Sequence, residues 1–190
     1  MELEAISKSF NQQKVLDNLS LKINKGERMC LLGPSGCGKT TALRLIAGLE
    51  VPDKGKIVIN DCLVSNDKDI FKETPERGIG LVFQDLSLFP HLNVFENVSY
   101  SLHERGNEKI EQRTNYLLDC VGMLPFGKKY PHMISGGEQQ RVAIARALAP
   151  NPKLMLMDEP FTSLDNILRD EIRDLTLSLL SEEDTSVIMV

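Results

Sequence analysis

Residues 29–48 read MCLLGPSGCGKTTALRLIAG. The apolar run from Met29 to Leu32 is typical of a strand buried on both faces, and Gly33 to Thr40 match the pattern G-x-x-x-x-G-K-[ST]. Glycines let the backbone curl so that several N–H groups point inward, and a helix over Thr41 to Ala47, closed by Gly48, directs its positive end at the same point. The stretch therefore predicts a phosphate-binding loop between a buried strand and a helix.

The residues before this loop predict antiparallel strands. Apolar and polar residues alternate, which places Leu3 and Ala5 on one face of a first strand. Leu19, Leu21 and Ile23 share one face of a second strand in the same way. Because only one face of each strand is apolar, the pair is expected to form an antiparallel sheet.

The residues after the loop predict a parallel sheet with helices. Pro52 to Gly55 form an expected turn, and the polar residues 65–76 are expected to be a loop. Helix-like patterns over about 85–135 indicate an inserted helical subdomain. Apolar runs that suit buried strands cover residues 79–83, 154–157 and 186–190. Buried strands that alternate with helices are typical of an α/β fold, here one domain over residues 1–190.

Composition and charge narrow the function classes. The net charge of −5 argues against nucleic acid as the main partner, because phosphate backbones are bound by basic surfaces. The longest apolar runs are about five residues, so we expect no membrane span, and with no signal-like start we expect a cytoplasmic protein. Reduced thiols, and no zinc site, are expected of the scattered cysteines Cys30, Cys37, Cys62 and Cys120.

The phosphate loop has a chemical reason for each of its polar residues. Lys39 can reach the β- and γ-phosphates of a nucleotide, and the Thr40 hydroxyl can ligate Mg²⁺. Cys37 is interpreted as a small filler residue. The alternative is a glycine turn with a surface lysine. The expected nucleotide-binding residues here are Gly33, Pro34, Ser35, Gly36, Cys37, Gly38, Lys39 and Thr40.

Two carboxylates follow the apolar run 154–157. A buried carboxylate needs a compensating cation, so Asp158 is expected to face Mg²⁺, through water. Glu159 then stands where it can orient or deprotonate an attacking water. The alternative is a pair of solvated acids at a strand exit.

Residues 134–141 read ISGGEQQR. Ser135 followed by Glu138 three residues later is a capping box, which by itself means only a well-capped helix. Capping does not explain Gly136 and Gly137, which would let a ligand approach the helix N-terminus closely.

With this third motif the sequence resembles the ABC transporter ATPases, whose LSGGQ signature lies between the phosphate loop and the acidic pair. The resemblance covers essentially the whole chain and implies a P-loop NTPase fold. It also implies a head-to-tail dimer, in which Ser135, Gly136 and Gly137 of one subunit contact the ATP held by its partner. Glu138 departs from the family's usual glutamine and adds negative charge near the phosphates.

The resemblance assigns further positions one by one. Gln84 matches the glutamine that touches Mg²⁺ or water and couples the site to the membrane subunit. Asp165 matches the D-loop aspartate, although it could be only a helix N-cap. Phe10 matches the aromatic that stacks on adenine, although it could be a core residue. Thr41 matches a contact to the α-phosphate.

Residues 89–98, FPHLNVFENV, resemble the importer branch that moves ferric iron, polyamines, sulfate or sugars. An ordinary core helix explains Val94, Phe95 and Val98 equally well. The implied partners are a membrane permease, a second ATPase subunit and, indirectly, a substrate-binding protein, with the chain at the cytoplasmic face of the membrane. The cargo, ferric iron or polyamine, is a guess from overall similarity. An ABC ATPase of translation or DNA repair is an alternative that the acidic charge and the lack of tandem halves disfavour.

The family's switch histidine follows the strand that matches 186–190, and the sequence printed here stops at Val190. His91, His103 and His132 lie elsewhere and cannot be assumed to replace it. The expectation is a domain incomplete at its C-terminus. The competing hypothesis is a truncated module that binds nucleotide and hydrolyses it poorly.

Overall fold

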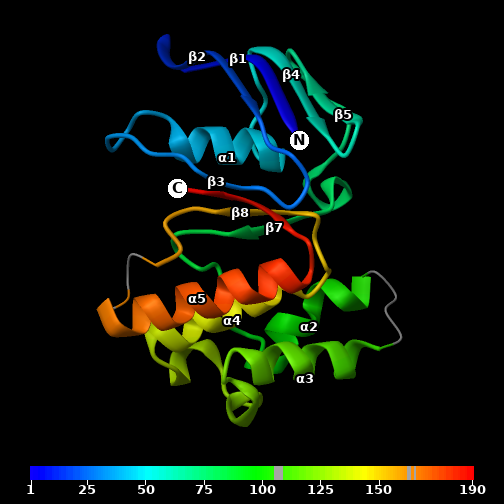
Figure 1. Cartoon of the computed structure of the whole chain (residues 1–190), viewed down its shortest axis with the longest axis vertical. Coiled ribbons are helices and arrows are strands. Elements are labelled where there is room, and N and C mark those ends of the chain that lie inside the picture. The colour runs from blue at the N-terminus through cyan, green and yellow to red at the C-terminus, as the bar shows by residue number, and fades with distance from the viewer. Residues whose placement is uncertain (105–108, 162–163, 165) are drawn as a thin grey trace. The chain divides into compact units, whose positions relative to one another are not determined.

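The computed structural model describes residues 1–104, 109–161, 164 and 166–190, and the chain divides into two compact units. The first unit consists of Met1–Leu81, Lys153–Asp158 and Asp184–Val190. The second consists of Val82–Pro152 and Glu159–Glu183. Strands and helices alternate along the chain (Figure 1), which confirms the predicted α/β class.

The first unit holds a helix and two sheets. An antiparallel sheet has the order β2-β1-β4-β5-β6, with β1 Glu2–Phe10, β2 Gln13–Lys22, β4 Lys54–Ile59, β5 Cys62–Asn66 and β6 Asp69–Ile70. A second sheet has the order β3-β9-β8-β7, with β3 Arg28–Cys30, β9 Ser186–Met189, β8 Leu154–Met157 and β7 Ile79–Val82. In this second sheet β9 pairs in parallel with both β3 and β8.

Helix α1, Lys39–Ala47, lies between these two sheets (Figure 1). Its residues Leu45 and Ile46 are fully buried in one hydrophobic core. The antiparallel sheet contributes Leu3, Ile6 and Ile57 to that core, and the parallel sheet contributes Leu154, Leu156 and Ile188. Apolar residues from both sheets thus enclose the helix that follows the phosphate loop, and this fixes the position of its N-terminus.

The first strand forms as predicted, but one of its two inward residues differs. Ala5 is exposed with a φ of 52°, and the register of β1 against β2 shifts between Leu3 and Ile6. Such a β-bulge inserts one extra residue and reverses the alternation beyond it. Ile6, and not Ala5, therefore joins Leu3 in the core.

The predicted strand at Met29 to Leu32 is shorter and less buried than expected. β3 ends at Cys30, Met29 is half-buried, and Leu32 is 87% exposed. Within the described sheet β3 lies at the edge, so only one side of it is paired. The prediction of burial on both faces was wrong because an apolar run does not reveal how many neighbours its strand has.

The polar stretch 65–76 is not simply a loop. It contains the end of β5, the short strand β6 and a 3₁₀ helix, η1, at Thr74–Arg77. β6 exists because it pairs with β5, a tertiary contact that composition does not report. The turn predicted over 52–55 is a bend at Asp53, after which β4 begins at Lys54.

Arg77 holds the C-terminal end of α1 and is only 3% exposed. Its Nη1 donates to the carbonyl oxygens of Leu45, at 3.1 Å, and Ile46, at 2.8 Å. Its Nη2 donates to the Ser65 hydroxyl at 2.8 Å, and further donations reach the carbonyls of Val64 and Lys72. Burial lowers the pKa of this guanidinium, which the negative end of the helix dipole helps to compensate.

Gly48 ends α1 with a φ of 80°, and a Cβ there would lie 2.6 Å from Arg77 Nε. Gly78 has a φ of 64° and open space around its Cβ position, so an alanine there would show the cost of the left-handed backbone alone. We expect Gly78→Ala to cost about 1 kcal/mol, and Gly48→Ala about 3 kcal/mol because the bonded guanidinium cannot move aside. Urea unfolding of both variants measures the difference; equal losses would contradict it.

The second unit is mainly helical. Its helices are α2 Val94–Glu104, α3 Ile110–Cys120, α4 Gly136–Leu148 and α5 Asn166–Glu182, with 3₁₀ helices η2 Leu124–Phe126 and η3 Pro131–Met133. Arg113 of α3 donates to the Leu148 and Ala149 carbonyls at the end of α4 and pairs with Glu183. The predicted helical subdomain at 85–135 falls within this unit, and its boundaries stay a prediction.

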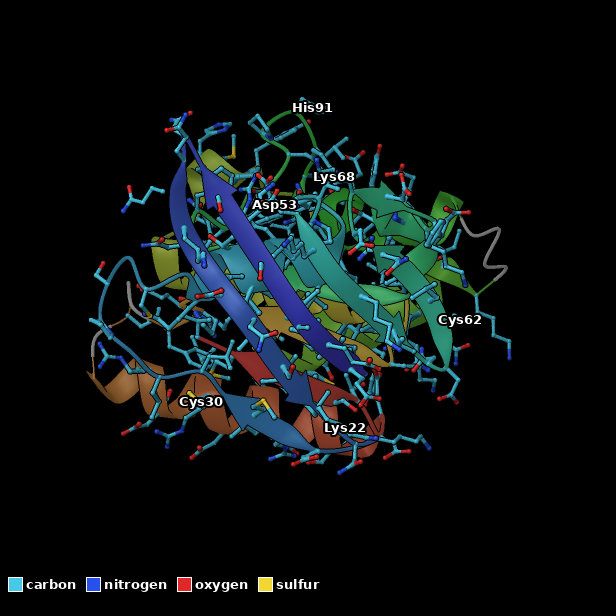
Figure 2. All side chains as sticks on the ribbon, turned by 90° about the horizontal axis from the view of Figure 1, so that it is seen from above. Lys22, Cys30, Asp53, Cys62, Lys68 and His91 are labelled. Carbon is cyan, nitrogen blue, oxygen red and sulfur yellow. The ribbon has the colours of Figure 1, made fainter. Side chains whose placement is uncertain are left out.

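Over the described part of the chain, no helix combines the length and apolar character that crossing a membrane requires. The four cysteines are free. Three of them, Cys30, Cys37 and Cys62, belong to the first unit, and of these Cys30 and Cys62 lie well apart (Figure 2).

Candidate nucleotide site

The phosphate loop leads into α1 through Gly38, whose φ is 96°. A Cβ on Gly38 would lie 2.8 Å from Leu16 Cδ2 and 3.0 Å from the Val15 carbonyl, so the loop packs closely against β2. Among the described residues no side chain caps this helix start. The first N–H groups of α1 thus remain available to an anion, as the sequence predicted for a phosphate site.

Lys39 is the first residue of α1, and its ammonium turns back over the loop. Its Nζ donates to the carbonyl oxygens of Gly33, at 2.9 Å, and Pro34, at 2.8 Å, and lies 3.7 Å from Cys37 Sγ. The positive charge therefore stands over the curled backbone of the loop. The loop residues Pro34, Ser35, Gly36 and Cys37 are exposed, and Thr41 is half-buried in the first turn.

Thr40 and Asp158 meet although 118 residues separate them. The Thr40 hydroxyl donates to Asp158 Oδ1 over 3.1 Å, and Asp158 is 8% exposed at the end of β8. Asp158 is close to the helix start because α1 packs on the sheet that contains β8. A hydroxyl and a carboxylate side by side are hard oxygen ligands of the kind that Mg²⁺ prefers.

Phe10 ends β1 at the hairpin to β2 and is 41% exposed. The two turn residues, Asn11 and Gln12, both have positive φ, as a two-residue hairpin turn requires. Lys8 Nζ lies 5.0 Å from the centroid of the Phe10 ring. The ring is thus an accessible platform on β1, and β2, which follows its turn, contacts the phosphate loop at Leu16.

Glu159 belongs to the second unit and follows the buried Asp158. It is exposed and has a φ of 47°, which is uncommon for a residue with a side chain. Such left-handed backbone directs a side chain away from the path of the preceding strand, and it is concentrated at functional sites.

Ser135 starts α4 as predicted, with both halves of the capping box present. Its hydroxyl accepts from the Glu138 N–H at 3.3 Å, and Glu138 Oε2 accepts from the Ser135 N–H at 2.7 Å. The hydrogen bond from the Ser135 backbone holds the pKa of Glu138 below its ordinary value. Gly136 is exposed with open space around it, so this helix start is accessible to a ligand.

Gln84 is exposed in a turn of the second unit. The sequence analysis did not identify Arg146, which binds the backbone of the residues that follow Gln84. Arg146 of α4 donates to the Leu86 and Ser87 carbonyls at 2.8 and 2.6 Å, and its guanidinium covers the Phe89 ring. No spacing rule links an arginine late in one helix to carbonyls about sixty residues earlier, so only the structure could identify this contact.

Asn97 explains the segment that begins with Phe89. It is fully buried in α2, accepts from the Phe89 N–H at 2.9 Å and donates to the carbonyls of Phe89, Leu92 and Asn93. The signal in the sequence was a single asparagine within an apolar helical face. Asp165, the predicted D-loop aspartate, lies outside the described residues.

A family model described as ABC transporter matches residues 16–162, which include the phosphate loop, the Ser135 helix start and the Asp158-Glu159 pair. The chain belongs to the ABC transporter family. Its fold is accordingly the ABC ATPase cassette, an α/β P-loop NTPase. Membership supports ATP as the nucleotide of the phosphate loop.

Individual relatives agree with this family assignment. The chain is 43% identical to an Fe(3+) ions import ATP-binding protein of Haemophilus influenzae, over 100% of the chain and 54% of the relative. It is 47% identical to a sulfate/thiosulfate import ATP-binding protein of Pseudomonas syringae, over 91% of the chain and 53% of the relative. The chain thus spans about half the length of the curated relatives it matches.

A solved structure of the same fold is a dimeric, post-hydrolysis state of the ATP-binding cassette MJ0796 bound to ADP and Pi. It superposes with a TM-score of 0.86 at 36% identity, over 100% of this chain and 87% of that one.

Proposed function

We propose that this chain is the ATP-binding and hydrolysing subunit of an ABC importer. The observation that carries the proposal is the contact between Thr40 and Asp158 at the uncapped start of α1. It joins a metal-binding hydroxyl and a carboxylate beside a lysine and a row of N–H groups. Together these groups suit a nucleotide triphosphate with its divalent cation.

The first-unit residues divide the work on the phosphates. Loop N–H groups and Lys39 bind the β- and γ-phosphates, and Thr41 contacts the α-phosphate. Thr40 and, through water, Asp158 would hold Mg²⁺, and Gln84 of the second unit would be a further ligand. When bound, Mg²⁺ neutralises charge that builds up on the phosphate oxygens.

Hydrolysis then requires a positioned water. Glu159, exposed at a left-handed backbone position directly after Asp158, orients the water and accepts its proton. The reaction is an in-line displacement in which the water oxygen bonds to the γ-phosphorus and the bond to the β–γ bridging oxygen breaks.

A second copy of the chain completes the site. In this dimer Ser135, Gly136 and Gly137 contact the nucleotide of the partner, and the accessible Gly136 at the start of α4 supports this role. Asp165 is a further proposed nucleotide-binding residue. The MJ0796 cassette is described as a dimer, and its similarity to this chain supports the same assembly here.

Transport needs a permease. Relatives named as Fe(3+) and sulfate/thiosulfate import ATP-binding proteins support a function in import. The proposal further places the chain at the cytoplasmic face of the membrane, with a substrate-binding protein as an indirect partner. Gln84 and the helical subdomain are the proposed contacts to the permease. Import names among the relatives favour this function over a hydrolysis-poor binding module.

Lys39→Ala tests the phosphate site. We expect the Kd for Mg·ATP to rise about 30-fold, because the substitution removes charge-assisted hydrogen bonds to phosphate. Fluorescence titration with a labelled ATP measures the change. Lys14→Ala is the matched control, since Lys14 pairs with Asp17 on the surface and its side chain is 58% exposed. Equal affinities of the two variants would overturn the assignment.

A further inference from the structure

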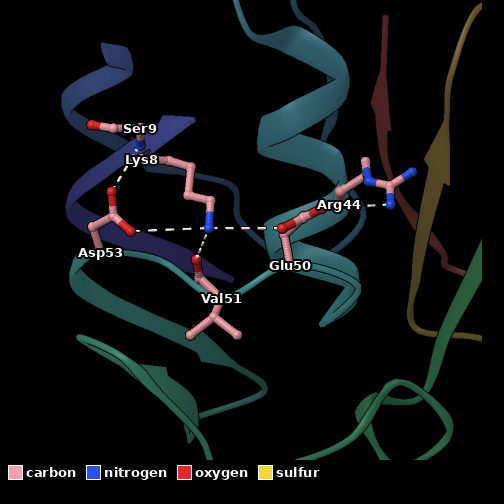
Figure 3. A network of polar contacts seen from close by, with 6 residues as sticks. All are labelled: Lys8, Ser9, Arg44, Glu50, Val51 and Asp53. Atoms are coloured by element: carbon pink, nitrogen blue, oxygen red, sulfur yellow. Dashed lines mark hydrogen bonds and ion pairs between the residues drawn. The ribbon is translucent and has the colours of Figure 1, made fainter. Parts of the chain in front are cut away.

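Lys8 is nearly buried, with its side chain only 12% exposed. Its ammonium contacts three polar groups that are shown in Figure 3. Nζ donates to the Val51 carbonyl at 2.7 Å and lies 3.7 Å from Glu50 and 3.9 Å from Asp53. A lysine costs free energy to desolvate, so this enclosure has to be compensated by these three partners.

The partners of Lys8 all come from the segment that follows α1. Gly48 closes the helix, the Leu49 N–H donates to the Arg44 carbonyl at 2.9 Å, and Arg44 also pairs with Glu50 at 3.6 Å. Glu50 therefore contacts both the last turn of α1 and Lys8. The ammonium is thereby tied to the helix whose other end carries the phosphate loop.

The same segment holds the end of β1. The Asp53 N–H donates to the Ser7 carbonyl at 2.9 Å, and Asp53 Oδ2 accepts from the Ser9 N–H at 2.7 Å. Ser9 immediately precedes Phe10. The backbone on both sides of Lys8 is thus fixed against the segment after α1, and Figure 3 shows the contact on the Ser9 side.

Lys8 also contacts the ring itself, since its Nζ lies 5.0 Å from the Phe10 centroid. A cation at this distance from an aromatic ring is attracted to the electron-rich face. Phe10 nonetheless remains 41% exposed, so the ring still offers surface to a ligand.

We propose that Lys8 is a positioning residue for the nucleobase, which fixes the Phe10 ring at a set distance from the phosphate loop. This inference rests on the proposed ATP-binding function and on the expectation, implied by the family resemblance, that the Phe10 ring stacks on adenine. A nucleotide binds at two points, phosphates at one end of α1 and base on Phe10. The nucleotide binds more tightly if the distance between the Phe10 ring and the phosphate loop is already fixed in the free protein. A mobile ring would lose conformational entropy on binding, which lowers the affinity.

The test compares ATP with UTP, which share the triphosphate and differ in the base. A purine stacks more strongly than a pyrimidine. The ratio of the Kd for UTP to the Kd for ATP therefore measures how much the stacking of the base on Phe10 contributes to binding. We expect Lys8→Met to reduce the preference for ATP about 5-fold while the Kd for UTP changes little, and Phe10→Ala to abolish the preference. Lys8→Arg, which keeps the cation, should retain part of it.

Lys56→Met is the matched control, because Lys56 lies in the same sheet and pairs with Glu4 on the surface. It should leave the ratio unchanged. Thermal unfolding checks that Lys8→Met folds; if it does not, Glu50→Gln weakens the same network from the α1 side and should lower the ratio in the same direction.

The outcomes separate the two proposals. If Phe10→Ala leaves the ratio unchanged, Phe10 is not the base platform, and the expectation that it stacks on adenine fails together with the inference, whereas the phosphate site tested by Lys39→Ala is unaffected. If Phe10→Ala lowers the ratio and Lys8→Met does not, the platform stands and the role of Lys8 is overturned. Equal weakening of ATP and UTP by Lys8→Met also overturns it, because Lys8 then acts on the fold as a whole.

Discussion

Replacing Glu159 with glutamine is expected to lower the rate of ATP hydrolysis about 1,000-fold, since the amide cannot accept the proton of the attacking water. The two side chains have the same size, so the backbone at φ 47° and the binding of ATP should be unchanged. An ATP-bound dimer should therefore accumulate. Phosphate release measures the rate, and gel filtration with Mg·ATP measures the dimer.

Glu171→Gln provides the matched control, because Glu171 is exposed on α5 and is assigned no part in the site. It should hydrolyse ATP at the parent rate. If Glu159→Gln also hydrolyses at the parent rate, another group handles the water. If Glu159→Gln fails to bind ATP, Glu159 contributes to binding, and its assignment as the general base loses its support.

The second large effect is expected at Arg77. Arg77→Met removes all five hydrogen bonds of the guanidinium and leaves the carbonyls at the end of α1, and the Ser65 hydroxyl, without their donor. We expect a loss of about 3 kcal/mol in the free energy of unfolding, which corresponds to a fall in Tm of about 9 °C. Differential scanning calorimetry measures the Tm, and urea unfolding gives the free energy.

Arg173→Met makes the same chemical change on the surface of α5, where Arg173 pairs with Asp170 and Asp174. Its Tm should change by less than about 2 °C. Arg77→Lys should lie between the parent and Arg77→Met, because an ammonium has three donors at one point and cannot reach the acceptors on α1, on β5 and at Lys72 together. A Tm for Arg77→Met as high as that for Arg173→Met would contradict the proposed stabilisation of the end of α1 by Arg77.

The predicted features that hold in the structure depend on neighbours close in the chain. The capping box at Ser135 and Glu138 forms as its three-residue spacing requires. β8 is buried over its whole length, as four successive apolar residues suggested. In each case the hydrogen bond or the burial pattern follows from backbone geometry over a few residues.

Predictions failed where a neighbour distant in sequence decides the outcome. Ala5 was expected in the core, but the bulge against β2 brings in Ile6. Leu32 was expected to be buried, but its strand lies at the edge of the described sheet and ends before it. Alternation and apolar runs describe one strand at a time and carry no information on its partners.

For the candidate site, the sequence by itself determined the phosphate loop, the acidic pair, the signature helix start and the family. These motifs are contiguous, and their chemistry requires particular residue types at short spacing. Only the tertiary structure decided that the Thr40 hydroxyl meets Asp158, that Arg77 secures α1, and that Lys8 contacts both the segment after α1 and the Phe10 ring. The partners in the last two contacts include backbone carbonyl oxygens, which every residue carries. No sequence pattern therefore predicts which carbonyl oxygens will accept these hydrogen bonds. That is decided only when folding brings particular carbonyls next to a buried side chain.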